Sequence, residues 1–230
     1  MKFKYIKSNV EESGCIVGHF IMTDLAPGQG LTIGNALRRV LLCNLEGTAI
    51  TAIRIPGVSH EFSTISCIRE DILEILLNLK QIILRTKKTE VISGKIKAKG
   101  PGIITANCIT FDSNVQIVNP NQYIATISSS QSIEFDIIAE YNIGYSFGEE
   151  RKDKNSNFLN VDAIFMPVNK VNYKINQIYL HYNETVETLT FEITTNGSLT
   201  PEKALNKAAK KLMVWFEILN SNDLNIEDPF

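Results

Sequence analysis

Hydrophobic residues alternate with polar ones along two stretches near the N-terminus, Ile16–Asp24 and Thr48–Ile55. This period of two predicts a strand at each. Between them, Leu31–Leu45 has hydrophobic residues at helical spacing, which predicts a helix directly after a glycine-rich turn. We expect Thr32 to be its N-cap and Gly47 to terminate it.

A second helix is predicted over Cys67–Leu84, with Ser66 as its cap, because its apolar residues follow a stripe while its charged residues lie on the other side. Everything that follows it, up to Tyr145, has the short period of strands separated by turn residues. The predicted strands are Val91–Ala98, Ile103–Ile109, Val115–Val118, Tyr123–Ile127 and Ile133–Ile143.

Three further strands are predicted over Val161–Val168, Asn172–Tyr182 and Thr188–Thr194. The last element is a helix that continues to Leu219. Its start is marked by Thr200, Pro201 and Glu202, which supply a cap, a proline at the first helical position and an acid in the first turn. The remaining residues, Asn220–Phe230, are polar, and we interpret them as a linker.

The order of these elements predicts an α+β protein in two parts. The amphipathic helices outside the β-rich middle lie near the two ends of the chain, so we expect residues 1–47 and 168–230 to form one discontinuous domain. Residues 48–167 then form a β-rich domain inserted into it. We find no internal repeat.

The composition excludes several classes of protein. Of the 230 residues, 44% are hydrophobic and 21% charged, which is ordinary for a globular protein and excludes disorder, collagen and coiled coil. The net charge of −2 argues against a domain that binds nucleic-acid phosphates directly, since such domains are normally basic. No apolar stretch reaches the length of about 20 residues that a bilayer requires. The four scattered cysteines predict reduced thiols.

The glycine-rich turn, Gly28–Gly34, lies between a predicted strand and a predicted helix, as a dinucleotide-binding loop does. Its spacing differs from G-x-G-x-x-G, and the βαβ pattern that should follow is missing. A tight turn with close helix packing at Gly34 is therefore the favoured interpretation, and a nucleotide-binding oxidoreductase is the alternative. We find neither histidines at metal-ligand spacing nor clustered carboxylates, so we expect no catalytic residue and no metal site.

Two surfaces of the predicted helices are candidates for contacts with other proteins. Arg38 and Arg39 lie off the apolar stripe and form either a solvated face or a patch that binds carboxylates or carbonyl oxygens of a partner. The apolar stripes of the first and last helices form either core or a two-fold interface with a second copy of the chain. The residues predicted for that homodimer interface are Ile33, Leu37, Leu41, Leu45, Leu205, Leu212, Trp215, Phe216 and Leu219.

Five blocks of sequence, spread over most of the chain, resemble the alpha subunit of bacterial-type RNA polymerase in the order that this family has them. The blocks are Gly28–Leu42 (GQGLTIGNALRRVLL), His60–Thr64 (HEFST), Arg69–Lys80 (REDILEILLNLK), Val161–Val168 (VDAIFMPV) and Thr195–Leu205 (TNGSLTPEKAL).

The resemblance implies a non-catalytic scaffold that dimerises through its first and last helices and holds the β and β′ subunits of the polymerase. It implies β contacts at Arg38, Arg39, His60, Glu61, Phe62, Ser63 and Thr64. It implies β′ contacts at Val161, Asp162, Ala163, Phe165 and Pro167.

The resemblance also implies that this chain holds no cofactor, that Mg²⁺ belongs to the catalytic partner subunit and that DNA is contacted only through the complex. The family's C-terminal domain, which binds DNA and activators, is absent from the sequence up to Phe230. The chain is rich in Ile and Asn, and the sequences of the last two blocks resemble those of plastid-encoded members. We therefore expect a plastid protein, with a bacterial cytoplasmic protein as the alternative.

Overall fold

A computed structural model describes residues 2–11, 14–58, 60–86, 91–112, 114–151, 157–179 and 185–220. The chain divides into two compact units, residues 1–45 with 168–230 (unit 1) and residues 46–167 (unit 2). The chain passes from unit 1 to unit 2 after Leu45, two residues before the boundary predicted after residue 47. It returns to unit 1 at Val168, the position predicted for the second boundary. Antiparallel sheets combined with separate helices confirm the α+β class.

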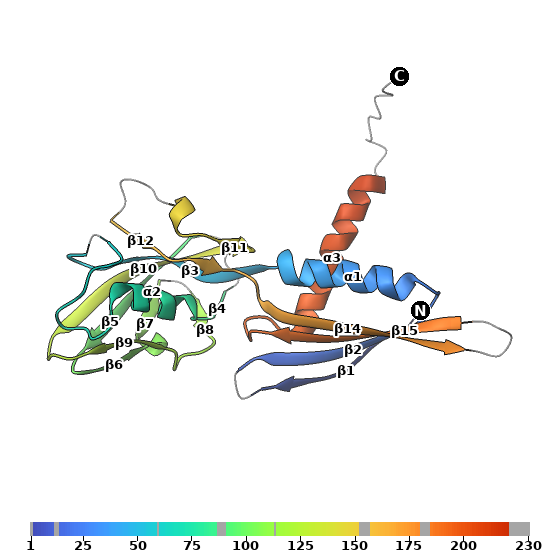
Figure 1. Ribbon diagram of the computed structural model, residues 1–230, viewed down its shortest axis with the longest axis horizontal. Coiled ribbons are helices and arrows are strands. Elements are labelled where there is room, and N and C mark those ends of the chain that lie inside the picture. Colours follow the sequence, from blue (N-terminus) through green and yellow to red (C-terminus); the bar gives the residue numbers. More distant parts are fainter. Residues whose placement is uncertain are drawn as a thin grey trace, which may run out of the picture. The chain divides into compact units, whose positions relative to one another are not determined.

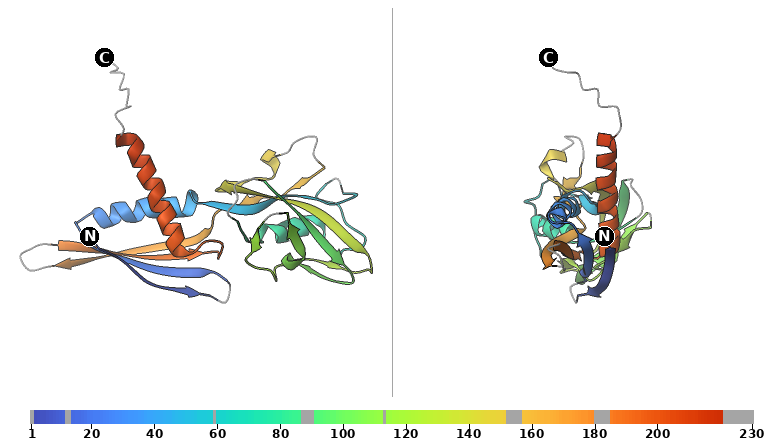
Figure 2. Two further views of the ribbon diagram at one scale, coloured as in Figure 1. Left: turned by 180° about the vertical axis from the view of Figure 1, so that it is seen from behind. Right: turned by 90° about the vertical axis from the view of Figure 1, so that its right-hand side faces the viewer.

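Unit 1 is a four-stranded antiparallel sheet with two helices on one face (Figures 1 and 2). The strand order is β1 (Lys2–Val10), β2 (Ile16–Leu25), β15 (Thr185–Thr195) and β14 (Val168–Tyr179). The helices are α1 (Gln29–Cys43) and α3 (Pro201–Asn220). In both figures α3 crosses α1, and its C-terminal end projects beyond the other elements of the unit.

The core of unit 1 lies between this sheet and its helices. Alternate residues of β15 face the helices and are buried, as the period of two requires. Buried residues of the two helices pack against these strand residues. The largest members of this core include Phe20, Leu25, Leu41, Leu45, Leu189, Phe191 and Ile193.

The sequence analysis did not predict β1. All nine of its residues are exposed, and the strand pairs its backbone with β2. Phe3 and Tyr5 lie against the buried ring of Phe20, with ring centroids 5.9 and 5.4 Å away. These two rings explain why the first residues belong to the sheet.

Unit 2 is built around one larger antiparallel sheet. Its order is β7 (Ile109–Phe111), β5 (Ile92–Lys99), β10 (Ser132–Ile143), β3 (Glu46–Arg54), β4 (Leu84–Arg85) and β8 (Gln116–Ile117), and β12 (Leu159–Asn160) also pairs with β3. Two small sheets join β6 (Gly102–Thr105) with β9 (Tyr123–Ile127), and β11 (Tyr145–Ser146) with β13 (Ala163–Ile164).

Helix α2 (Ile72–Lys80) supplies the core of unit 2 with an apolar face, formed by Ile72, Ile75 and Leu79. This face contacts β9 and β3. Two 3₁₀ turns, Ala106–Cys108 and Glu149–Arg151, complete the unit.

The predicted second helix is too long at both ends. Residues Cys67–Arg69 pair with β9 instead: Ile68 bridges Ile127, and the Arg69 amide donates to the Thr126 carbonyl over 3.1 Å. The buried Glu70 carboxylate then accepts hydrogen bonds from the Tyr123 hydroxyl and the Thr126 amide. These tertiary bonds hold the segment extended, so the helix begins after Asp71 and not after Ser66.

Helix α1 also differs at its ends from the prediction. It begins at Gln29, with Gly28 as N-cap, and the Thr32 hydroxyl donates back to the Gly28 carbonyl from inside the helix. It ends at Cys43, and Gly47 lies in β3. By contrast, α3 begins at Pro201 as predicted.

Two predicted strands are broken. Ile103–Ile109 contains a 3₁₀ turn between β6 and β7. Val161–Val168 is not one strand: only Ala163–Ile164 pairs, as β13, and Val168 begins β14 in the other unit. Of the predicted linker, residues 221–230 lie outside the described part of the chain, and Asn220 ends α3.

Candidate subunit interfaces

Arg38 and Arg39 lie on the exposed side of α1, while Leu37, Val40 and Leu41 face the core of unit 1. The prediction that they lie off the apolar stripe is confirmed. Neither guanidinium has a hydrogen bond or an ion pair with another described residue of the chain. Both guanidinium groups are therefore available to donate hydrogen bonds to acceptors on another molecule.

The glycine-rich turn that precedes them already holds an anion. Glu187 of β15 is 5% exposed, and its Oε1 and Oε2 accept hydrogen bonds from the amides of Gly28 (3.0 Å) and Gly30 (2.9 Å). These two bonds hold the pKa of the Glu187 carboxyl below its usual range. The first amides of α1, which a nucleotide phosphate would need, are thus bound by the chain's own carboxylate. This arrangement gives no support to the oxidoreductase alternative.

Gly34 packs against the ring of Tyr173, as the close-packing interpretation predicted. A Cβ at this position would lie 2.9 Å from the ring. The Tyr173 hydroxyl donates to the Asn35 side chain over 2.8 Å, which fixes the ring across the helix. Neither Glu187 nor Tyr173 was found by sequence reasoning, because each lies far along the chain from the turn that it supports.

The nine residues predicted for a homodimer interface differ widely in exposure. Leu41 and Leu45 are buried in the core of unit 1, which corrects their assignment to a surface, while Leu37 and Leu205 are buried but line an apolar hollow. Ile33 and Leu212 are half-buried. Trp215, Phe216 and Leu219, at 44%, 63% and 62% exposure, lie on the projecting end of α3. Met213, Val214 and Ile218 are exposed there too, and the sequence analysis missed them.

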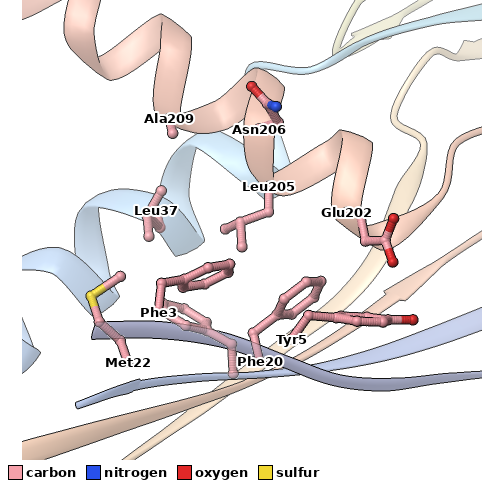
Figure 3. Close-up of a pocket in the computed structure, with 10 residues that line it drawn as sticks. Phe3, Tyr5, Phe20, Met22, Leu37, Glu202, Leu205, Asn206 and Ala209 are labelled. Atoms are coloured by element: carbon pink, nitrogen blue, oxygen red, sulfur yellow. The ribbon is translucent and has the colours of Figure 1, made fainter. Parts of the chain in front are cut away.

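Unit 1 also has an apolar hollow of about 430 Å³ between β1, β2, α1 and α3 (Figure 3). Aromatic rings of the strands form its floor, and Leu37 and Leu205 point into it from the two helices. The residues that line it are Phe3, Tyr5, Phe20, Met22, Leu37, Phe191, Glu202, Leu205, Asn206 and Ala209.

In unit 2, residues 60–64 contain a turn that is closed by a hydrogen bond from the Ser63 amide to the His60 carbonyl. The His60 ring contacts the Ser63 hydroxyl over 3.0 Å, and the Ile72 amide donates to the Ser63 carbonyl. Phe62 is 76% exposed, which makes it one of the most exposed large apolar side chains in the described chain. The turn therefore presents an aromatic ring outward while its backbone is held to the first residue of α2.

Asp162 is the centre of a polar network in unit 2. Its Oδ1 accepts from the Gly148 amide (2.9 Å) and its Oδ2 from the Tyr145 hydroxyl (2.7 Å), and Lys80 Nζ lies 3.5 Å from Oδ2. These groups, the Gly148 amide foremost, hold the pKa of the Asp162 carboxyl below its usual range. Lys80 Nζ also donates to the Tyr145 oxygen over 3.0 Å. The network ties α2 to β11 and to the segment before β13.

In the segment predicted to contact β′, most of the side chains expected to face a partner face the core of the chain. Val161, Ala163, Phe165 and Pro167 are buried, so these side chains are not available to a partner. Asp162 is half-buried, and Ile164, which was not predicted, is 45% exposed. The alternation of a short extended segment turns every second residue inward, and the more apolar set fills the core.

The structure brings part of the two predicted contact segments of unit 2 together. His60, Glu61 and Phe62 line a hollow of about 260 Å³ together with Asn160 and Asp162. Arg38 and Arg39 belong to unit 1.

Among the described residues, no group of three or more His, Cys, Asp or Glu side chains could hold a metal ion. None of the helices in that part of the chain combines the length and the apolar character needed to cross a bilayer.

Comparison with known proteins gives one matching family model, "RNA polymerase Rpb3/RpoA insert domain", over residues 53–166. The DNA-directed RNA polymerase subunit alpha of Trieres chinensis is 51% identical over 222 residues, which cover 96% of this chain and 71% of the relative. The subunit of Pyropia yezoensis is 43% identical, covering 98% and 73%. That of Synechococcus elongatus is 41% identical, covering 94% and 71%. The similar proteins thus come from a diatom, a red alga and a cyanobacterium.

Proposed function

The chain belongs to the family of DNA-directed RNA polymerase alpha subunits, the assembly scaffold of the bacterial-type enzyme, and from this premise we propose that it forms a homodimer that holds one β and one β′ subunit. The observation that carries the proposal is the projecting end of α3. Six large apolar side chains are exposed there, from Met213 to Leu219. A soluble subunit leaves such a cluster exposed only where another surface covers it.

A second copy of the chain supplies a fitting surface. The end of α3 is apolar on several sides, and the hollow over Phe3, Phe20 and Leu37 is lined almost entirely by apolar side chains. In a two-fold dimer each copy offers the same pair of surfaces, a projecting helix end and an apolar hollow, so both are buried at once. Covering a Phe, Leu, Ile or Met side chain completely contributes about 1.5–3 kcal/mol, so a few of them suffice for a stable dimer.

The test places charges on the helix end. Phe216→Glu with Leu219→Glu should give a folded monomer, because both side chains are more than 60% exposed and contribute nothing to the core of unit 1. Sedimentation velocity measures the mass, and circular dichroism the fold. Lys203→Glu, on the exposed side of the first turn of α3, is the control and should remain a dimer. A dimeric double variant would contradict the proposed interface.

For the β contact we propose two groups of residues. The first is the pair of exposed guanidiniums on α1, Arg38 and Arg39, which have no partner among the described residues. The second is the turn of residues 60–64, from which Phe62 projects. Arginine and exposed aromatic residues are the types that contribute most to protein interfaces.

Arg39→Ala tests this contact. The variant should remain a folded dimer and capture β less well by about 2 kcal/mol, since an arginine removed from an interface leaves its acceptors unpaired. Copurification of co-expressed, tagged chain with β gives the measurement. Lys174→Ala, an exposed cation on β14 of the same unit, should leave capture unchanged. Equal capture by the Arg39 variant would remove this residue from the contact.

For the β′ contact we propose the outward side of the segment around β13, which consists of Asp162 and Ile164. The network of Lys80, Tyr145 and Asp162 fixes the polar part of this surface. We propose no catalytic role for the chain: the Mg²⁺ used in nucleotidyl transfer belongs to the catalytic subunit, and DNA is reached through the complex.

We further propose that the chain acts in a plastid, and keep the bacterial cytoplasm as the alternative. Relatives from diatoms and red algae, at 43–51% identity, support the plastid, while cyanobacterial relatives at 41–44% are about as similar to this chain as the red algal ones. A tagged chain recovered from its native extract should bring with it two large polymerase subunits, and their peptide masses would identify the compartment.

A further inference from the structure

Helix α1 is anchored to the sheet of unit 1 by a carboxylate from another part of the chain. Both oxygens of Glu187 are used, one for the Gly28 amide and one for the Gly30 amide. Gly30 fits only because it has no side chain, since a Cβ there would lie 2.8 Å from Glu187 Oε2 and 3.3 Å from Ile175. The anchor thus fixes the position of the first turn of α1 along the sheet.

A second contact fixes the rotation of the same helix. One turn further on, Gly34 lies directly against the Tyr173 ring, and Asn35 accepts a hydrogen bond from the hydroxyl of that ring. A helix held only by apolar side chains can slide or turn by small amounts at low cost, because such contacts have no preferred direction. Hydrogen bonds to a buried carboxylate are directional and stronger than those between neutral groups.

We propose that Glu187 is a positioning residue for the partner contact of α1: its carboxylate sets the placement of the helix that carries Arg38 and Arg39. The arginines follow Gly30 by eight and nine residues, about 12–13.5 Å along the helix axis. Glu187 itself is buried and cannot touch a partner. This inference rests on the proposed β contact, and its test is designed so that the two can fail separately.

The first variant is Glu187→Gln, which keeps the shape and removes the charge. A glutamine has one acceptor oxygen, and its NH₂ group would face the second amide, so one of the two anchoring bonds is lost. The variant should remain a folded dimer and capture β about tenfold more weakly, because energy comparable to that of the lost hydrogen bond must then be spent on placing the helix when β binds. Hydrogen exchange should show faster exchange of the Gly28 and Gly30 amides.

The matched control is Glu192→Gln on the same strand. Glu192 is half-exposed on the opposite face of the sheet, and its carboxylate accepts a hydrogen bond from Asn172 and not from α1. The Glu192→Gln variant should capture β as well as the unchanged chain does. Arg38→Ala with Arg39→Ala tests the underlying contact: if this double variant captures β normally, the proposed function fails at this surface, whatever Glu187 does.

Chemical rescue separates positioning from a general loss of stability. Glu187→Ala leaves a space next to two unpaired amides that a small carboxylate can enter. Added acetate should slow amide exchange at Gly28 and Gly30 and restore part of the capture of β, while chloride at equal ionic strength should not. If the alanine variant is unfolded, the capture of β by the folded Glu187→Gln variant, compared with that by Glu192→Gln, decides the question.

Two results would overturn the inference. One is normal capture of β by Glu187→Gln in a preparation in which the double arginine variant fails to capture it. The other is an alanine variant that responds to acetate and chloride alike.

Discussion

At the scale of single residues, the hydroxyl of Tyr145 has a role that its sequence position does not reveal. It donates to Asp162 Oδ2 and accepts from Lys80 Nζ, and it is the main cause of the raised pKa of Lys80. Tyr145→Phe removes both bonds and should lower the free energy of unfolding by about 1 kcal/mol. Urea unfolding of the variant and of the unchanged chain measures this difference in the free energy of unfolding. Tyr141→Phe is the control, because that hydroxyl has no hydrogen bond within the described chain, and equal effects of the two variants would contradict the network.

Glu187 makes the stability of unit 1 depend on pH. The Gly28 and Gly30 amides lower the pKa of its carboxyl in the folded state, whereas the unfolded chain has the ordinary value of about 4.3. The stabilisation is therefore complete above about pH 4.3 and is lost as the pH falls through the lower, folded pKa. In urea unfolding, the midpoint difference between the unchanged chain and Glu187→Gln should be largest near pH 7 and shrink in acid. A difference that does not change with pH would show that the carboxylate is not the cause.

At the scale of elements, the sequence predicted best what local residues determine. The start of α3 was predicted because Thr200, Pro201 and Glu202 are adjacent in the chain and act on the first turn itself. The start of α2 was not, because β9 and Tyr123 hold Cys67–Glu70 extended from a distant part of the sequence. The strand β1, which pairs with β2, was also missed.

The same distinction explains the candidate contacts. The sequence predicted which segments are contact candidates and that Arg38 and Arg39 lie off the apolar stripe, but it did not determine which side chains of a short segment face outward. In Val161–Pro167 the register is set by the pairing of β13 with β11 and by the Asp162 network. The predicted apolar residues therefore face the core, and Ile164 faces outward.

Ile164 allows a direct test of this register. Ile164→Glu should leave unit 2 folded and weaken capture of β′ tenfold or more, the effect of a charge placed at an interface position. Ile103→Glu, on an exposed residue of β6 in the same unit, should not change capture. Phe165→Glu, only one residue further, should unfold the unit, because that ring is fully buried. Normal β′ capture by the Ile164 variant would exclude this residue from the contact.

At the scale of the whole molecule, the two units should fold as separate chains. Unit 2 is one continuous segment of about 120 residues with a hydrophobic core of its own, which is a sufficient size for independent folding. Its two ends lie together: Gly47 and Phe165 are in backbone contact, so closely that a Cβ at Gly47 would overlap the Phe165 carbonyl. A short linker can therefore join Leu45 to Val168 in its place.

Two shortened chains test this division. Residues 46–167 alone should give a folded monomer with a dispersed amide NMR spectrum, because the apolar end of α3 is not part of it. Residues 1–45 joined to 168–230 by a short Gly-Ser linker should give a folded dimer, because the exposed α3 residues and the apolar hollow both belong to unit 1. A dimeric unit 2, or a monomeric linked unit 1, would move the homodimer interface away from α3, and the assignment of dimerisation to unit 1 would then be wrong.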